Sequence, residues 1–359
     1  MGGPPRVCTC LLAEQSRSHE CWLASYPSNE DEVQLPDAVQ RIPVAGFGID
    51  EKLFGRASKK TFADLDVRFD AIHLHNVWEP ILISAAGFAK KQNIPYSVTP
   101  HGMLDPWSIS QKTAKKKLAL FLGRRRLLEQ ANFIHVLTDD EEQSVRKLGF
   151  KNRCEVIPNG VDLEKVDQSL DPLPFQREFP SIAGKPFILF LGRLHYVKGL
   201  DILAKAMPDF FAQFPDWRLV VAGPDGGAQV EFEEAIAKSG FSEKVHVIGP
   251  IYGSEKFSLL ANCEIFCQPS RQEGFSVSIL EALSASKPVV ITSHCRFDEV
   301  SQRSCGTVDE LEPSAISRSL CHLASSPDRK QMGQNGRKLV EEKYTWRRIS
   351  DQLLTRYLS

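Results

Sequence analysis

Two glutamates, Glu273 and Glu281, flank the start of a predicted helix with seven residues between them. A strand-like run precedes them, and apolar residues then recur at helical spacing, at Val277, Leu280 and Leu283. A helix that begins after a loop presents unpaired backbone N–H groups and the positive end of its dipole, which suit a phosphate. Glu281 would lie about 8 Å further along the helix axis. This separation suits one carboxylate beside a sugar and the other beside a ribose; the alternative is chance spacing.

Two cations follow another predicted strand, Phe187–Leu191. Arg193 and Lys198 fall in the loop after this strand, and the loop leads through Gly199 into a helix. At the carboxyl end of a parallel strand, such a pair can neutralise a diphosphate and stabilise it as a leaving group. The alternative is a pair of exposed surface cations. The carboxylate loop favours the first interpretation, because it predicts a phosphate site on the same edge of the same sheet.

The composition is that of a globular protein with more than one domain. The chain has 359 residues, of which 42% are hydrophobic and 25% charged. Its net charge of −1 gives no basic field of the kind that nucleic-acid binders show. Nine cysteines without a CxxC pair indicate reduced thiols rather than disulfides or zinc ligands. We see no apolar run of membrane-spanning length and no signal-peptide core, so we expect a cytoplasmic protein.

Strands and helices alternate along both halves of the chain, which predicts parallel, doubly wound α/β sheets. In the first half, we expect strands at residues 21–25, 41–44, 71–75, 95–99, 133–137 and 154–157, with helices at 79–91, 112–129 and 139–148. In the second half, we expect strands at 187–191, 218–222, 245–248, 265–267 and 289–292. His75-Asn76 and His101-Gly102 follow two strands of the first half and are placed at its ligand-binding edge.

The chain begins with a Gly2-Gly3 turn that opens a helix without the strand that normally precedes such a turn. That strand would be central in a doubly wound sheet. We therefore expect the first domain to lack its first strand, either because the native chain starts upstream of Met1 or because the first half is impaired.

Three further segments have an expected role. The basic run Lys112–Arg126 could lie on an anionic membrane surface, although a solvated basic helix face is the slightly favoured alternative. Residues 160–183, with three prolines and little periodicity, indicate an interdomain linker. A last amphipathic helix beginning at Tyr344-Thr345-Trp346 is expected to pack back across the domain junction, with Trp346 as its anchor.

Taken together, these motifs resemble those of the family-four retaining glycosyltransferases. The resemblance rests on GRLHYVKG at Gly192–Gly199, the two glutamates Glu273 and Glu281, VIPNGVD at Val156–Asp162, His101-Gly102-Met103 and the closing Tyr344-Thr345-Trp346. It implies a GT-B fold, in which two Rossmann-like domains face a cleft and the second holds the nucleotide-sugar donor. It also implies sugar transfer with retention of configuration, no metal and no cofactor besides the donor. Asp64-Leu65-Asp66 has the spacing of a metal motif but lacks a clear preceding strand.

The resemblance also implies roles for individual residues. Arg193 and Lys198 are similar to the diphosphate-binding pair, Glu273 to the glutamate that bonds the donor sugar, and Glu281 to the one that holds the ribose hydroxyls. The remaining predicted contacts are the loop residue Gly274, the backbone N–H groups of Phe275 and Ser276, His101 near the reacting sugar, and Gly2-Gly3 approaching the donor from the first domain. We expect Glu273, His101, Arg193 and Lys198 to be catalytic. The family often has glycine where Ser276 and Ser286 stand, which affects donor fit and a helix end respectively.

The resulting prediction is a glycosyltransferase that moves a sugar from a nucleotide-diphosphate donor to a saccharide or lipid-linked acceptor in cell-surface polysaccharide or glycolipid synthesis. We expect an acceptor domain at residues 1–170, a donor domain at 184–343 and the returning helix at 344–359. Contact through Lys112–Arg126 would place the protein at the inner face of the membrane. The alternative is a truncated, inactive nucleotide-binding remnant or partner of another transferase. A GT-B epimerase or phosphorylase is a weaker rival, because no lysine context indicates pyridoxal phosphate.

Overall fold

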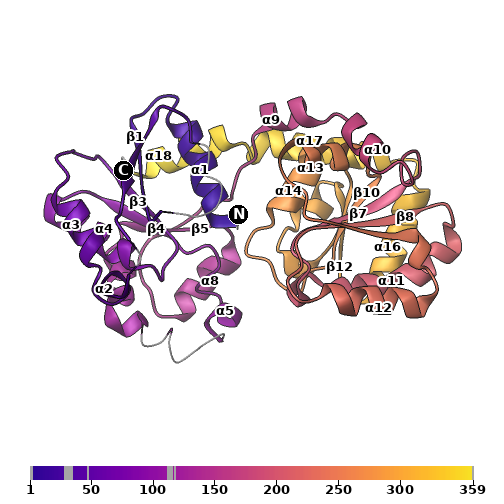
Figure 1. Ribbon diagram of the computed structural model, residues 1–359, viewed down its shortest axis with the longest axis horizontal. Helices are drawn as coiled ribbons and strands as arrows, with labels where there is room; N and C mark the ends of the chain where they lie inside the picture. Colours follow the sequence, from indigo (N-terminus) through magenta and orange to yellow (C-terminus); the bar gives the residue numbers. More distant parts are fainter. Residues whose placement is uncertain (1–2, 28–34, 47, 111–115, 117–118, 358–359) are drawn as a thin grey trace. The chain divides into compact units, whose positions relative to one another are not determined.

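The computed structural model describes residues 3–27, 35–46, 48–110, 116 and 119–357. The chain divides into two compact units (Figure 1). The first unit comprises Met1–Gly160 together with Trp346–Ser359, and the second comprises Val161–Thr345. The division thus falls at Gly160, about ten residues before the predicted limit of the first domain, and the returning segment begins at Trp346.

The second unit is a six-stranded parallel sheet in the order β12-β11-β10-β7-β8-β9. The strands are β7 (Phe187–Leu191), β8 (Arg218–Ala222), β9 (Val245–Gly249), β10 (Ile265–Gln268), β11 (Val289–Thr292) and β12 (Gly306–Asp309). The first of them in sequence, β7, lies between β8 and β10, so the strand order reverses there. Ligands of doubly wound sheets bind beyond the carboxyl ends of the strands at such a reversal.

Two hydrophobic clusters cover the two faces of this sheet, as the period-two alternation of a strand requires. In β7, Phe187, Leu189 and Leu191 belong to one cluster, whereas Ile188 and Phe190 belong to the other. The first cluster is covered by α9 (Leu163–Ser169), α10 (Leu173–Glu178), α13 (Gly253–Asn262), α14 (Val277–Ser284) and α17 (Arg329–Lys343). The second is covered by α11 (Leu200–Gln213), α12 (Gln229–Ser239) and α16 (Pro313–Ser325), and α15 (Glu299–Gln302) precedes β12.

The prediction of a linker over residues 160–183 is wrong, because α9 and α10 form there and pack into the second unit. Phe175 of α10 is 3% exposed within the hydrophobic cluster. Two of the three prolines that suggest a break in the sequence stand at a helix start, where proline is tolerated because its missing N–H would have no helical partner. Pro172 is the N-cap of α10 and Pro174 lies in its first turn.

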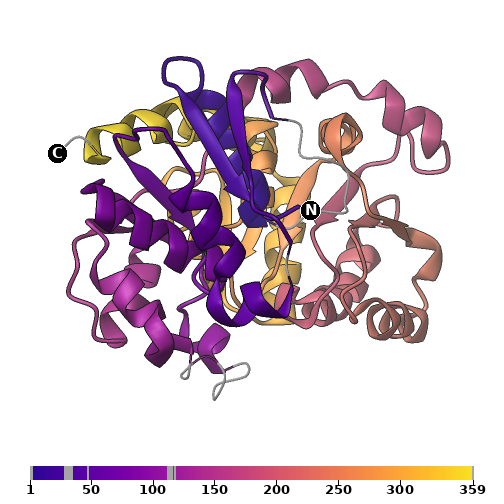
Figure 2. The ribbon, with the colours of Figure 1, turned by 60° about the vertical axis from the view of Figure 1, so that its left-hand side comes forward.

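The first unit holds a four-stranded parallel sheet in the order β3-β4-β5-β6. Its strands are β3 (Ile72–His75), β4 (Tyr96–Thr99), β5 (Phe133–Val136) and β6 (Cys154–Val156). A separate parallel pair is formed by β1 (Cys21–Ser25) and β2 (Val39–Pro43) (Figure 2). The helices of this unit are α1 (Gly3–Gln15), α2 (Ile49–Phe54), α3 (Arg56–Ala63), α4 (Pro80–Gln92), α5 (Pro106–Ser110), α7 (Arg125–Glu129), α8 (Asp139–Lys147) and α18 (Trp346–Tyr357). Within the described residues, α1 is the first element of the chain. The described strands of this half form two sheets, whereas the sequence predicts a single sheet.

The basic run predicted as the helix 112–129 lies partly outside the described residues. Its described part contains a π-helical turn, η1 (Leu120–Arg124), followed by α7. Arg124 is half-buried and donates to the Trp78 carbonyl at 3.0 Å. Arg125 pairs with Glu129 at 2.8 Å, and Lys116 lies over the Trp78 ring. These cations therefore make contacts within the first unit, and membrane contact stays a prediction.

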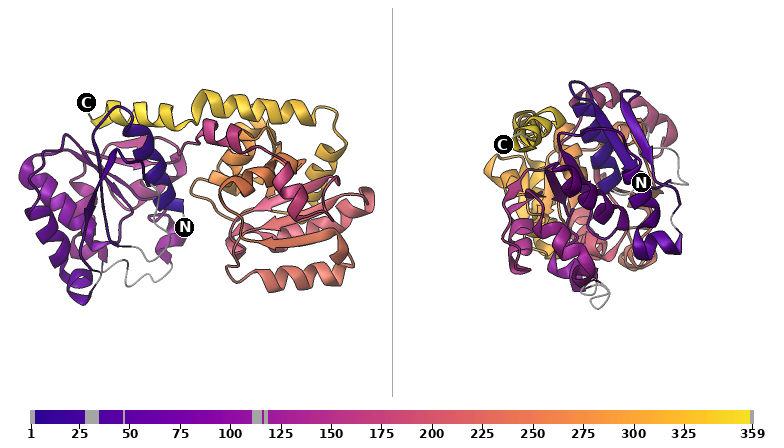
Figure 3. Two further views of the ribbon diagram at one scale, coloured as in Figure 1. Left: turned by 45° about the horizontal axis from the view of Figure 1, so that its top comes forward. Right: turned by 90° about the vertical axis from the view of Figure 1, so that its left-hand side faces the viewer.

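The last helix, α18, packs on α1 within the first unit (Figure 3). Trp346 is 7% exposed, in a hydrophobic cluster with Val7, Leu11 and Phe133. Gly160 lies so close that a Cβ there would stand 2.7 Å from the Trp346 backbone nitrogen. The C-terminal segment is thus part of the first unit's core, and Trp346 anchors it.

We expect Trp346→Ala to destabilise the first unit by about 3–5 kcal/mol, the usual cost of truncating a buried tryptophan. Urea unfolding followed by circular dichroism, with hydrogen exchange of α1 and β5 amides, would measure the change and locate it. Arg347→Ala, which changes an exposed neighbour, should stay within about 0.5 kcal/mol of the parent. Equal losses in the two variants would contradict the anchoring role.

Candidate functional site

Two loops meet at the strand reversal of the second unit. One follows β7 and carries Arg193 and Lys198, and the other follows β10 and carries Glu273. Because β7 and β10 are neighbouring parallel strands, both loops leave the sheet at the same edge. The structure therefore brings together the cation loop and the carboxylate loop that the sequence predicts.

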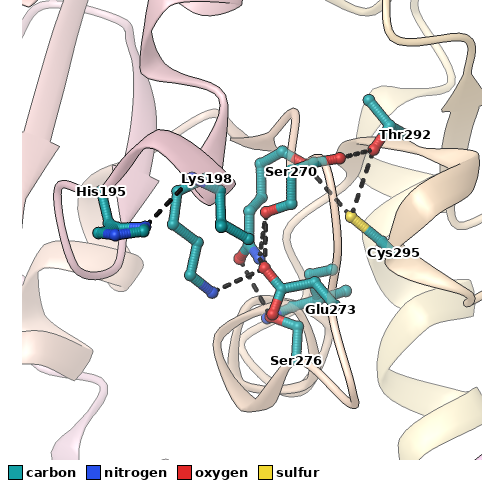
Figure 4. A network of polar contacts seen from close by, with 10 residues as sticks. His195, Lys198, Ser270, Glu273, Ser276, Thr292 and Cys295 are labelled. Carbon is teal, nitrogen blue, oxygen red and sulfur yellow. Dashed lines mark hydrogen bonds and ion pairs between the residues drawn. The ribbon is translucent and has the colours of Figure 1, made fainter. Parts of the chain in front are cut away.

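The Glu273 carboxylate is the centre of a buried polar network (Figure 4). Its Oε1 accepts hydrogen bonds from Lys198 Nζ, Gln268 Nε2 and Ser270 Oγ, each at 2.6 Å. Glu273 is 8% exposed, whereas the Lys198 side chain is 22% exposed. A buried charge requires a partner and hydrogen bonds, and the network supplies both. Gln268 and Ser270 are not among the predicted site residues, because no sequence motif marks them.

Backbone contacts fix the two loops against each other. Gly199 has φ of 71°, and a Cβ there would lie 1.9 Å from the Pro269 carbonyl oxygen. Arg271 binds the Asp201 carboxylate through two hydrogen bonds of 2.7 Å and donates its backbone N–H to the Val197 carbonyl at 2.7 Å. Bidentate arginine–carboxylate pairs fix orientation as well as distance. The position of Lys198 relative to Glu273 is therefore set by the fold.

Arg193 is exposed at the start of the same loop. A Cβ at Gly226 would stand 2.9 Å from its Cγ, so the loop after β8 contacts the aliphatic part of this side chain. Lys198 and Arg193 thus lie on one loop, with Lys198 bound to the carboxylate and Arg193 nearer solvent.

Ser276 is the N-cap of α14, immediately after Gly274 and Phe275 in the carboxylate loop. Its hydroxyl accepts from the Ile279 N–H at 3.5 Å and donates to Gln268 Oε1 at 3.1 Å. The hydroxymethyl group is thus held by contacts within the protein. The Phe275 ring packs against Phe297 and Tyr344, which anchors the loop before the first turn of the helix.

Ser286, the other departure from the family pattern, stands just beyond the end of α14. Its φ of 58° is in the left-handed region, where glycine is favoured. A Cβ at Gly333 would lie 2.0 Å from the Ser286 carbonyl oxygen, so α17 packs directly on this turn. The serine therefore carries a modest conformational cost at a helix end, away from the network around Glu273.

Glu281 lies in the second turn of α14 and is 3% exposed. Its Oε1 accepts a hydrogen bond of 2.5 Å from Nζ of Lys256, a residue of the first turn of α13 whose side chain is 7% exposed. Lys256 is a further residue of the site that the sequence motifs do not include. The only signal in the sequence is a single lysine before the apolar residues Phe257, Leu259 and Leu260, and pairing between helices cannot be inferred from spacing.

His101, predicted near the reacting sugar, lies in the first unit beyond β4 with φ of 54°. Its Nε2 is 3.0 Å from His75 Nδ1, and the two rings stack. Burial lowers the pKa of His101 well below its usual value and that of His75 to about 3. Both imidazoles are therefore neutral at physiological pH, and His101 is suited to hydrogen bonding rather than to charge stabilisation.

Two more histidines extend this group. Thr99 Oγ1 lies 2.6 Å from His73 Nε2 and 2.7 Å from His135 Nδ1, and the Tyr357 hydroxyl lies 2.6 Å from His73 Nδ1. Burial lowers the pKa of His73 as well, and that of His135 to about 4. The His73 ring also packs on the His75 ring, with their centroids 4.2 Å apart, so the C-terminal helix contacts the histidine group that includes His101.

The remaining predicted residues are less informative. Gly2 lies outside the described residues. Gly3 begins α1, and a Cβ there would meet nothing within 4 Å, so no described contact requires a glycine at this position. In the part of the chain that the structure describes, no group of three histidine, cysteine or acidic residues could hold a metal ion. Independence from metal stays a prediction.

Comparison with known proteins identifies the family. The model for group 1 glycosyl transferases matches residues 174–339, and the model for glycosyltransferase family 4 matches residues 1–165. The chain belongs to the family 4, group 1 glycosyltransferases. One subunit of the human phosphatidylinositol N-acetylglucosaminyltransferase is 26% identical over 292 residues, which are 79% of this chain and 56% of the human one. The chain thus spans about half the length of that curated relative.

Solved structures confirm the GT-B fold. The sucrose-phosphate synthase of Thermosynechococcus elongatus superposes with a TM-score of 0.79 at 18% identity, over 99% of this chain and 93% of that one. HepE of Anabaena, in complex with UDP-glucose, gives a TM-score of 0.75 at 16% identity, over 99% and 96% of the two chains. Within the described residues, no helix is both long and apolar enough to cross a membrane.

We expect Gly199→Ala to cost about 2–4 kcal/mol of stability, from the strained φ together with the clash on the Pro269 carbonyl. Gly240→Ala is the matched control, because its φ of 80° is similar and a Cβ there meets nothing within 4 Å. Its cost should be about 1 kcal/mol. Thermal unfolding of both variants gives the cost of the clash as the difference between their two losses of stability. If the two variants have similar melting temperatures, the two loops can move apart.

Proposed function

We propose that the protein is a retaining glycosyltransferase that uses a nucleotide-diphosphate sugar, bound by the second unit. The observation that carries this proposal is the meeting of Lys198, Glu273 and the first turn of α14 at the strand reversal. A cation, an acceptor for sugar hydroxyls and a set of helix N–H groups are the three elements that a sugar diphosphate requires. UDP-glucose bound to the structural relative HepE supports a donor of this class.

The proposed chemistry depends on stabilising the leaving diphosphate. Lys198 and Arg193 would bind its oxygens, and the N–H groups at the start of α14 would bind the phosphate nearer the helix. The side-chain contacts and the backbone contacts both become more favourable as the sugar–oxygen bond breaks and negative charge develops on the diphosphate. In the structure, Lys198 bonds Glu273 at 2.6 Å. We infer that the donor takes over Lys198, which leaves the Glu273 carboxylate to accept from the sugar hydroxyls.

The proton of the acceptor hydroxyl would pass to the leaving phosphate itself, on the same face of the sugar, which gives retention of configuration. This assignment requires no side-chain base. The neutral imidazole of His101 would orient the sugar through a hydrogen bond. We assign the acceptor to the first unit, by family resemblance.

The acceptor is proposed to be a saccharide or lipid-linked molecule in glycolipid or polysaccharide synthesis. The phosphatidylinositol in the name of the human relative supports the lipid-linked class. A cytoplasmic location, with contact at the inner face of the membrane through residues 112–126, is part of the same proposal. The rival, an inactive remnant, is disfavoured because the GT-B fold extends over nearly the whole chain.

The test is donor hydrolysis and binding across UDP-, GDP- and ADP-sugars with the full chain. We expect turnover of one donor class and a loss of at least about 100-fold in kcat for Glu273→Ala, because this carboxylate would act mainly in the transition state. Arg193→Ala and Glu281→Ala should chiefly raise the dissociation constant of the donor. If all three variants keep the parent's activity, the site assignment is wrong. If the protein binds nucleotide but turns over no donor when acceptors are supplied, the inactive nucleotide-binding remnant is favoured instead.

Metal independence gives a separate prediction. Incubation with excess EDTA followed by gel filtration should leave donor turnover within about twofold of the untreated protein, because the cations of the proposed site are side chains. Turnover that is lost with EDTA and restored by Mg²⁺ or Mn²⁺ would contradict the proposal. Glu273→Ala with and without added metal serves as the inactive control.

A further inference from the structure

Lys256 and Glu281 form a buried ion pair next to the proposed donor site. The Nζ–Oε1 distance is 2.5 Å, and the side chains are 7% and 3% exposed. Lys256 is the fourth residue of α13 and Glu281 the fifth of α14, so both stand near the N-terminal ends of their helices. These helices follow β9 and β10, and each therefore starts at the ligand-binding edge of the sheet.

Stability does not account for this pair. The desolvation cost of two buried charges roughly cancels their attraction, and apolar residues of similar size are often as stable or more so. A lysine in the first turn of a helix also faces the positive end of the helix dipole. The two helices already share an apolar core, in which Phe257, Leu259 and Leu260 of α13 lie with Ile279, Leu280 and Leu283 of α14. A charged pair at this position therefore points to a ligand.

The geometry defines what kind of ligand group would be bound. Glu281 lies roughly 7 Å along the helix axis from Ser276, the N-cap at the proposed phosphate site. A ribose is attached directly to the diphosphate, and its 2′ and 3′ hydroxyls are hydrogen-bond donors. A carboxylate has two oxygens and about four acceptor positions, so it can accept from Lys256 and from hydroxyl groups at the same time.

We propose that Lys256 is a positioning residue for ribose recognition. Its ammonium fixes the Glu281 carboxylate as a buried anion, oriented so that the carboxylate accepts from the ribose hydroxyls of the donor. The inference rests on the proposed function, because it requires a nucleoside diphosphate in the second unit. It assigns to Lys256 no contact with the reacting atoms.

The test compares ribonucleotides with their 2′-deoxy analogues. Calorimetry on the full chain would give dissociation constants for UDP, GDP and ADP and for the three 2′-deoxynucleoside diphosphates. The parent should bind the preferred ribonucleotide at least about 10-fold more tightly than its deoxy form, as expected for a hydrogen bond to a charged group. In Lys256→Met the ratio should fall to within about threefold, because a buried carboxylate without its partner gives up its charge or its position.

Two variants separate this effect from misfolding. Lys256→Gln keeps a donor without the charge, and we expect it to fold and to retain only part of the ribose preference. Lys287→Met removes another half-buried lysine of the second unit, whose ammonium bonds the Ala261 carbonyl at 2.9 Å, and should leave the ratio unchanged. Circular dichroism and thermal unfolding establish that each variant is folded.

The possible outcomes are distinct. A parent that prefers the ribonucleotide, with the preference lost in Lys256→Met or reduced in Lys256→Gln, supports the inference. The same preference in the parent and in both variants overturns it, as does a parent that binds both forms equally. A parent that binds none of the nucleotides overturns the proposed function itself.

Discussion

The close approach of Gly199 to the Pro269 carbonyl is the constraint on which the site depends. A side chain at position 199 would place its Cβ 1.9 Å from that oxygen, so only glycine lets the loop after β7 reach the loop after β10. Lys198 precedes this glycine, and Glu273 lies four residues beyond Pro269. The ion pair between them is therefore a consequence of backbone packing at the strand reversal. Gly223 plays a similar part on the other side of β7, since a Cβ there would lie 1.9 Å from the Gly192 carbonyl oxygen.

Much of the second unit could be predicted from the sequence. Its strands β7, β8 and β11 begin and end where the apolar runs predict, because buried parallel strands are continuous in hydrophobic residues. The sequence also places two loops on one edge of the sheet, the loop with Arg193 and Lys198 and the loop with the glutamate pair. Both loops follow parallel strands, whose carboxyl ends lie at the same edge. Strand β12, Gly306–Asp309, could not be predicted in this way, because its residues are only partly buried and mixed in polarity.

Tertiary contacts determine the features that the sequence does not predict. Gln268 and Ser270 share the oxygen of Glu273 with Lys198, and this sharing arises only when β10 and its loop have folded. Lys256 meets Glu281 across two helices that are separated by a strand and a loop in the sequence. Prolines near residue 172 indicate a linker although they start a helix, because local chemistry does not distinguish the two uses of proline.

The two glutamates of the motif are held in different ways, and this difference follows from where their partners lie. In the proposed function, Glu273 would share its cation with the donor diphosphate, because Lys198 is on a partly exposed loop and could change partner when an anion with more charge binds. Glu281 has a partner that is more deeply buried and fixed on a helix, so its charge is compensated whether or not a donor is bound. An exchangeable cation would suit the proposed role of Glu273 beside a reacting sugar, and a permanent one would suit the proposed role of Glu281 beside a ribose. The spacing of the glutamates gives their positions, but their partners determine what each can do.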